Sequence, residues 1–237
     1  MSFKKISTKT LKQIFITEME TMILSEELKI GEKLPPERDI AHKMQISRSV
    51  VNDGIAALSK MGFLTIIPRY GTYVADYKSH GTIDILVAIM KNGNVSNEYI
   101  RSTLELRQQF MRFALEKIIP IITKEQIQCL RDICQKFNDE TSCHKGAEFI
   151  YQFDDLLMKY SGNLLLPILF SSFSVPNKLL LENYLENNGM KLMNDRNLNL
   201  LEAIEQKNIN KATEIIDHVL NEAIHGTTNI YKEKPAG

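Results

Sequence analysis

The feature that most constrains this chain is a change of residue periodicity at Gly62. Before Gly62, apolar residues recur at the three- and four-residue spacing of amphipathic helices. After it, two short β-rich runs, 63–67 and 72–74, flank Pro68-Arg69-Tyr70-Gly71, a sequence typical of a hairpin tip. This switch predicts a group of helices followed by a two-stranded sheet.

Turn and capping residues divide the helical part into three helices. A second helix is predicted from Pro36 to Met44, because proline fits the first helical turn. Ser47 can cap a third helix, which runs to about Lys60 and ends at Gly62, a left-handed C-cap. Three helices and a two-stranded wing form a winged helix-turn-helix. Apolar residues at helical spacing predict the first helix and the inner face of the third: Leu11, Ile14, Phe15, Met22 and Ile23, then Val51, Ile55 and Leu58.

From about Thr82 onward the pattern is helical throughout. It predicts an all-α bundle of six or seven helices, so the fold class is mostly α. The polar segment 76–81 is a candidate hinge between the winged helix-turn-helix domain, 1–77, and a helical domain, 82–230. One long helix carries the apolar stripe Leu104, Leu106, Phe110, Phe113, Ala114 and Ile118. The other predicted helices are 83–90, one that starts after the capping box Thr123-x-x-Gln126, 147–160, 164–173, 178–186, 191–206 and 210–225.

Charge and cysteine content set the class of protein. The formal net charge is +0, but residues 1–78 carry 12 basic against 9 acidic side chains, and the remainder carries 17 against 20. A mildly basic head on an acidic body fits a nucleic-acid reader joined to a domain that avoids DNA. Three cysteines without a C-x-x-C pair indicate reduced thiols and a cytoplasmic protein. Neither a membrane helix nor a secretory signal is expected.

The N-terminal end of the third helix carries the side chains expected to read DNA. In a helix-turn-helix this end enters the major groove, and Arg48 can donate two hydrogen bonds to guanine. The expected DNA contacts are Arg38 on the preceding helix, Ser47, Arg48, Ser49 and Asn52 on the reading helix, and Arg69, Tyr70 and Gly71 at the wing tip.

Three segments together resemble the N-terminal domain of the GntR family: Gly31–Ala41, Ile46–Val51 and Gly71–Val74. The resemblance implies DNA contacts at Arg38, at Ser47-Arg48-Ser49 and at the wing tip. It also implies a homodimer that binds a palindromic operator. Asn52 stands where the family usually has a second arginine, so a different operator sequence is expected.

The helical body resembles the FadR-type branch of that family, through Glu105-Leu106-Arg107 and Ser161-Gly162-Asn163. Many members of this branch hold a divalent metal with one Asp and three His. The matching positions here hold Ile150, Asp154, a residue near Asn197, and His218, so a metal site and other cofactors are not expected.

Without a metal, an anionic effector such as an organic acid or acyl derivative needs a cationic anchor. Arg107 is the candidate, because a guanidinium can clamp a carboxylate; a salt bridge to a neighbouring helix is its alternative role. Arg101 and Arg112 are further candidates on other faces of the helix. The remaining expected effector residues are Tyr151, Asp154, Asn197 and His218.

The sequence therefore predicts a transcription regulator, acting as a repressor, whose operator affinity a small molecule modulates. The alternative is an architectural DNA-binding protein without a ligand. An enzyme is not expected, because no P-loop, G-x-S-x-G or H-E-x-x-H occurs. The adjacent Asp154 and Asp155 cannot face one another on a helix.

Overall fold

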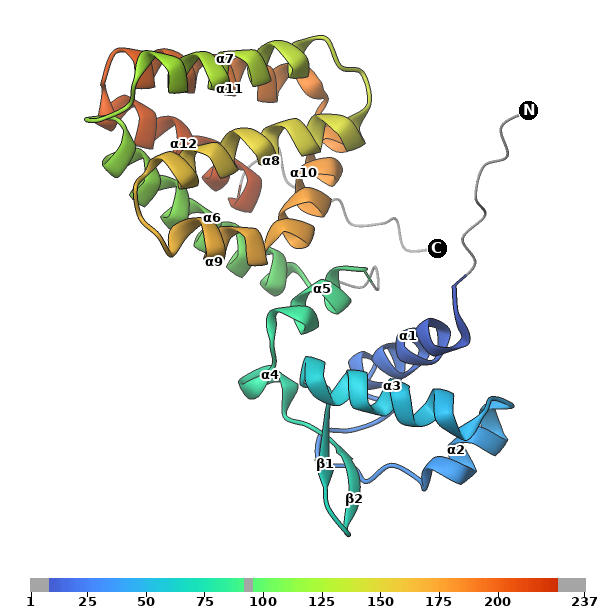
Figure 1. Ribbon diagram of the computed structural model, residues 1–237. Coiled ribbons are helices and arrows are strands. Elements are labelled where there is room, and N and C mark those ends of the chain that lie inside the picture. Colours follow the sequence, from blue (N-terminus) through green and yellow to red (C-terminus); the bar gives the residue numbers. More distant parts are fainter. Residues whose placement is uncertain (1–8, 92–95, 226–237) are drawn as a thin grey trace. The chain divides into compact units, whose positions relative to one another are not determined.

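A computed structural model describes residues 9–91 and 96–225. The chain divides into two compact units, residues 1–94 and 95–237. The first holds the helix-turn-helix and its wing, and the second is helical throughout its described part (Figure 1). The predicted fold class is confirmed.

The first unit begins with three helices, and the third starts and ends at the predicted caps, Ser47 and Gly62. The hydroxyl of Ser47 accepts a hydrogen bond from the Val50 N–H at 3.3 Å, and Gly62 ends the third helix with φ of 94°. A capping box between Thr10 and Gln13 starts the first helix. The elements are α1 (Leu11–Leu24), α2 (Glu37–Met44), α3 (Arg48–Met61), β1 (Leu64–Ile67) and β2 (Gly71–Val74).

Helices α1 and α3 pack closely at a glycine. A Cβ atom on Gly54, in the middle of α3, would lie 2.2 Å from Cδ1 of the buried Phe15 ring on α1. Glycine in a helix interior costs about 1 kcal/mol relative to alanine, so this approach explains its presence. Val51, Ile55 and Leu58 are buried beside it, as the periodicity predicts.

The wing is a two-stranded antiparallel hairpin extended by a third segment. Strand β1 pairs with β2 from Leu64↔Val74 to Ile67↔Gly71. The N–H of Leu34 donates to the Thr72 carbonyl at 2.8 Å, and the N–H of Gly31 donates to the Val74 carbonyl at 2.9 Å. The residues that precede α2 are therefore hydrogen-bonded to the wing, a contact that the sequence did not predict.

Two further helices follow the wing, α4 (Tyr77–His80) and α5 (Ile83–Lys91). The single turn of α4 falls inside the segment predicted as a polar hinge. Its buried Tyr77 ring lies 5.8 Å from the ring of Phe63. The Thr82 hydroxyl donates to the Met61 carbonyl at 2.8 Å, within the first unit. The predicted domain limits stay a prediction.

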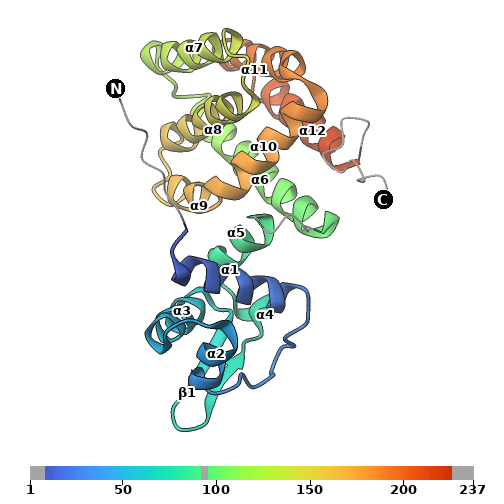
Figure 2. The same cartoon turned by 90° about the vertical axis from the view of Figure 1, so that its right-hand side faces the viewer.

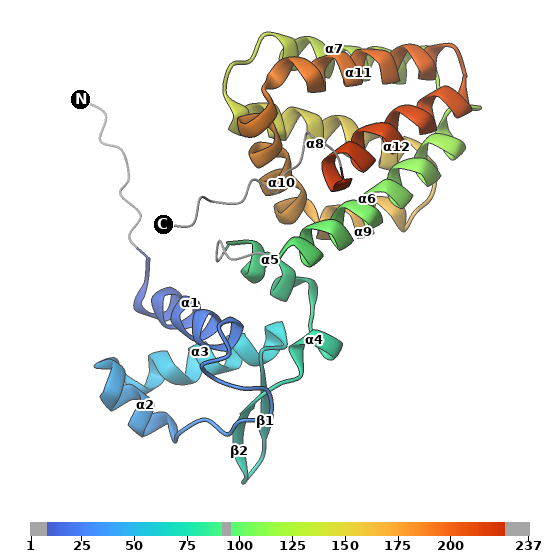
Figure 3. The same ribbon diagram turned by 180° about the vertical axis from the view of Figure 1, so that it is seen from behind.

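The described part of the second unit contains seven helices, the upper end of the predicted range. Figure 2 shows α7 beside α11 and α8 beside α10, and Figure 3 shows α6 beside α12. The helices are α6 (Asn97–Ile118), α7 (Lys124–Asn138), α8 (Cys143–Tyr160), α9 (Leu166–Ser172), α10 (Ser174–Asn188), α11 (Met190–Glu205) and α12 (Ile209–His225).

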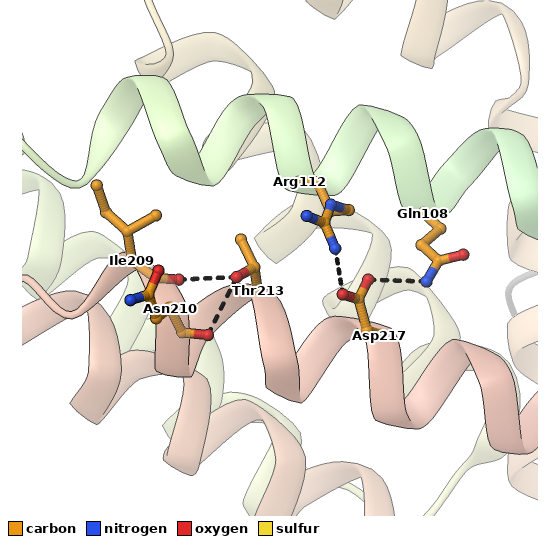
Figure 4. A network of polar contacts seen from close by, with 6 residues as sticks. All are labelled: Gln108, Arg112, Ile209, Asn210, Thr213 and Asp217. Carbon is orange, nitrogen blue, oxygen red and sulfur yellow. Dashed lines mark hydrogen bonds and ion pairs between the residues drawn. The ribbon is translucent and has the colours of Figure 1, made fainter.

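A polar network joins α6 to α12 (Figure 4). Arg112 forms an ion pair with Asp217, and the Gln108 side-chain amide donates to the same carboxylate at 2.7 Å. One turn before Asp217, and within α12, the Thr213 hydroxyl donates to the Ile209 carbonyl at 3.0 Å. Arg112 is thus part of a half-exposed link between two helices.

The Ser161-Gly162-Asn163 segment turns the chain from α8 into α9. Gly162 has φ of 73°, and the Ser161 hydroxyl donates to the Met158 carbonyl at 2.6 Å. The Asn163 side-chain oxygen accepts from the N–H groups of Leu165 and Leu166, each at 2.9 Å. This motif therefore has a structural role at a helix junction.

The apolar residues of α6 lie on two faces, not in the single stripe that the sequence predicted. Leu104, Ala114 and Ile118 are buried, whereas Leu106 and Phe113 are exposed.

Candidate nucleic-acid interface and buried polar cluster

The N-terminal end of α3 presents a set of exposed polar side chains. Ser47, Arg48, Ser49 and Asn52 are all exposed. The hydroxyls of Ser47 and Ser49 lie 2.9 Å apart. Arg48 and Asn52 are four residues apart and so share one side of the helix. The first N–H groups of a helix also favour a phosphate, so this end can bind DNA backbone and base edges together.

Arg48 is held by one contact on α2. Its Nε lies 3.4 Å from Oε2 of Glu37, while its side chain remains 74% exposed. Exposed ion pairs of this kind contribute roughly 0–1 kcal/mol. The guanidinium can therefore leave Glu37 at little cost and bind a guanine.

Arg38 lies on α2 with an exposed side chain. Its Nε is 3.6 Å from Oδ1 of Asp39, its neighbour in sequence. Figure 1 shows α2 beside the N-terminal end of α3, with the hairpin extending beyond the helices of this unit. Arg38 is thus available for a phosphate contact next to the reading helix.

The wing tip is a tight turn with an exposed aromatic residue. Arg69 adopts φ of 69°, and the N–H of Tyr70 donates to the Ile67 carbonyl at 3.0 Å. Gly71 has φ of 125°, and a Cβ there would lie 2.8 Å from Cε of Lys33. The turn presents the side chains of Arg69 and Tyr70 to solvent.

The second unit contains a buried cluster of charged residues. The carboxylate of Asp154 on α8 is fully buried and pairs with Arg107 of α6. Its other oxygen lies 3.6 Å from Nη2 of Arg196 on α11, and Nη1 of Arg196 donates to the Asn197 side chain at 2.7 Å. The Arg107 guanidinium therefore makes the interhelical salt bridge considered as its alternative role.

The cluster holds two cations and one carboxylate, an excess of one positive charge. Burial lowers the pKa of Arg196, and Asp154 opposes that shift. The Nε atoms of both arginines have no hydrogen-bond partner among the described residues. Buried polar groups normally have a hydrogen-bond partner. The excess positive charge and the two unpartnered Nε–H groups would therefore favour the binding of a second anion here.

Arg196 links this cluster to a cleft of about 490 Å³. Tyr184, Val219 and His218 also line the cleft, which is within the usual size of a small-molecule site. Arg107, Arg196 and Tyr184 also border a cavity of about 20 Å³, which has room for roughly one water molecule. Sequence reasoning missed Arg196, which is next to the predicted Asn197.

Among the other expected effector residues, Tyr151 lies apart from this cluster. Its buried ring stacks on Phe170 at 5.3 Å, with the Lys178 ammonium 5.1 Å from the ring centre. Burial raises the pKa of Tyr151 to about 12. Tyr151 therefore packs against α9 and α10.

The residues at the expected metal positions do not suit a divalent cation. Asp154 is enclosed by two guanidinium groups, which repel a cation, and Ile150 offers no donor. The described residues contain no group of three or more His, Cys, Asp or Glu placed to hold a metal. Within residues 9–91 and 96–225, no helix is long and apolar enough to cross a membrane.

Comparison with known proteins agrees with this geometry. Residues 14–74 match the family described as bacterial regulatory proteins, gntR family. The HTH-type transcriptional regulator Mce2R of Mycobacterium tuberculosis is 22% identical over 174 residues, which cover 73% of this chain and 72% of that protein. LutR of Bacillus subtilis is 31% identical over 87 residues, covering 37% of this chain and 38% of that regulator.

A fold that is similar along nearly the whole chain is found among solved structures. This is Lar, which controls the expression of the Listeria monocytogenes agr system and mediates virulence. The TM-score is 0.64 at 17% identity, with 97% of this chain and 100% of that chain covered.

The fold of the first unit and its exposed reading helix define a winged helix-turn-helix DNA-binding transcription regulator. The match over residues 14–74 places this reading head, residues 14–74, among the domains of the gntR family of bacterial regulatory proteins.

Proposed function

We propose that the chain binds a palindromic operator as a homodimer, with α3 in the major groove and the wing tip on the adjacent backbone. The observation that carries this proposal is the exposed end of α3, where Ser47, Arg48, Ser49 and Asn52 lie together. A dimer with two such helices reads half-sites spaced by about 10–10.5 base pairs. Asn52 can read adenine through a bidentate contact.

Selection from random duplex DNA with the full chain tests this proposal. The selected sequence should be two-fold symmetric. Arg48→Ala should reduce discrimination at one base position by roughly 5- to 150-fold, the equivalent of about 1–3 kcal/mol. Lys60→Ala is the matched control, since Lys60 is an exposed cation twelve residues farther along the same helix. If both variants lost base discrimination equally, Arg48 would contribute only its positive charge to DNA binding and would not read a base.

The helical domain is proposed to bind a small anionic effector, an organic acid or acyl derivative, and to belong to the FadR-type branch. The cleft beside Arg196 and His218 and the excess positive charge of the buried cluster support this proposal. The effector's anionic group would contact Arg196, which Asp154 and Asn197 would hold in place from behind. Arg107 would in turn hold Asp154. The chain would work in the cytoplasm.

The protein without effector would occupy the operator and repress transcription. Effector binding would release the operator. Two ligands that affect each other's affinity are coupled by the same free energy in both directions. A titration of operator DNA with and without a panel of short carboxylic acids and acyl thioesters measures this coupling.

The control for the effector site is a second arginine of the same domain. Arg196→Gln should abolish the thermal stabilisation that an active acid gives the wild-type protein. Arg131→Gln should retain it, because Arg131 pairs with Glu205 at the surface. If no acid stabilises the protein or changes operator affinity, the helical domain is not an effector domain of this type. The alternative, a ligand-independent architectural protein, then stands, and DNA binding is unaffected by that result.

A further inference from the structure

Helix α9 presents an unusual apolar surface. It buries only Leu166 and Phe170, and the residues between and before them point away from the core. Leu164 is 86% exposed, Leu165 65% and Ile168 61%. Single exposed leucines are common on soluble proteins, but contiguous groups of this kind mark interaction sites.

The segment around α9 contains no charged residue and has satisfied its own polar groups. Residues 161–177 include no Asp, Glu, Lys, Arg or His. The hydroxyls of Ser171 and Ser172 each donate to the Ile168 carbonyl at 2.9 Å. The Asn163 side-chain oxygen accepts from two backbone N–H groups. This surface can therefore leave water without burying a charge or losing these hydrogen bonds.

The apolar surface continues onto α6. The ring of Phe110 lies 6.2 Å from the ring of Phe173, at the end of α9, and Leu106 and Phe113 are exposed one turn to either side of Phe110. We call Leu106, Phe113, Leu164, Leu165, Ile168 and Leu169 the α6/α9 face.

The size of the α6/α9 face approaches that of a stable interface. With roughly 150–200 Å² for a fully exposed large side chain, its exposed fractions give an area on the order of 500–700 Å². A standard protein–protein interface buries about 800 Å² on each partner.

We propose that the α6/α9 face is where a second copy of this chain docks, face to face about a two-fold axis. In an isologous contact the same patch meets itself, and the α9 part of this face, which carries no charge, does so without like charges opposing one another. A charged partner would find no complementary charge on residues 161–177. The choice of a second copy rests on the proposed dimeric reading of a palindrome, and the inference names the surface that makes that dimer.

The test is analytical ultracentrifugation of the full chain without DNA. Leu169 on α9 and Leu198 on α11 are both 48% exposed leucines, so Leu169→Asp and Leu198→Asp form a matched pair. Figure 1 shows α11 and α9 at opposite ends of the helical unit. Leu169→Asp, or Ile168→Asp, should raise the dimer dissociation constant by at least about 30-fold, the lower limit of a hot-spot loss. Leu198→Asp should leave it unchanged.

A wild-type chain that sediments as a monomer would overturn the inference. So would α9 variants that remain as dimeric as the wild type, or a Leu198→Asp variant that dissociates equally. Circular dichroism of each variant confirms that the fold is retained. Binding to a single half-site, measured in parallel, reports on the reading head alone. Loss of the dimer with half-site binding retained supports the α6/α9 face, whereas a dimer that binds no DNA refutes the proposed function instead.

Discussion

Replacement of Asp154 by asparagine should strongly destabilise the helical unit. The carboxylate is fully buried between Arg107 and Arg196, whose side chains are 7% and 6% exposed. Asparagine keeps the volume and one oxygen acceptor, so the change opens no cavity, but it leaves two buried guanidinium groups without a counter-charge. Breaking a buried pair in this way costs about 3–5 kcal/mol. The lower figure applies here because the acceptor is retained.

Urea unfolding followed by far-ultraviolet circular dichroism measures this loss. With a slope of about 1–3 kcal/mol per molar urea, a loss of about 3 kcal/mol moves the midpoint by about 1–3 M. Asp217→Asn is the matched control, since it removes one carboxylate from the half-exposed pair with Arg112. Exposed pairs contribute about 0–1 kcal/mol. If both variants lose the same small free energy of unfolding, the cluster is not the desolvated ion pair described above.

Three further outcomes are expected. Gly54→Ala should lower stability by about 1–2 kcal/mol, because the overpacking penalty exceeds the gain in helix propensity; unchanged thermal unfolding would contradict the close packing of α1 on α3. Burial raises the pKa of the Cys134 thiol to about 11. At neutral pH a disulfide reagent should therefore modify exposed Cys129 and spare buried Cys134 until the protein unfolds. Equal rates of modification at the two thiols would contradict this. The side chain of Glu182 raises the pKa of His144, so its small stabilising effect is present in acid and is lost as pH rises through the folded-state pKa. An NMR titration in which Glu182→Gln leaves that pKa unchanged would exclude this cause.

The reading head could be predicted from the sequence because its determinants are local. Caps at Ser47 and Gly62, a proline at the start of α2, and a hairpin turn each act over a few residues. The contact between Leu34 and Thr72 could not be predicted, because it joins two segments through backbone groups that carry no side-chain signal.

The buried cluster, in contrast, could be predicted only in part, because it depends on contacts between helices that are distant in sequence. Arg107 and Asp154 were candidates for an effector site, and the structure brings these two residues together although they are 47 positions apart in sequence. Arg196 was missed, although one signal was available. It lies at a core position of α11, between buried Met193 and Leu200, where an aliphatic residue would be expected. A charged residue within an apolar stripe indicates a partner, but its identity depends on tertiary packing.

The hydrogen bonds between residues 31–34 and β2 have a consequence for engineering. They tie the strand behind the wing tip to the segment that leads directly into α2. A chimera could carry only the loop around Arg69 in another regulator. In that chimera the loop would be joined to strands of the recipient protein, which are hydrogen-bonded to the recipient's own segment before its second helix. Wing specificity in this protein is therefore best transferred as a cassette of two pieces, residues 31–34 together with 64–74.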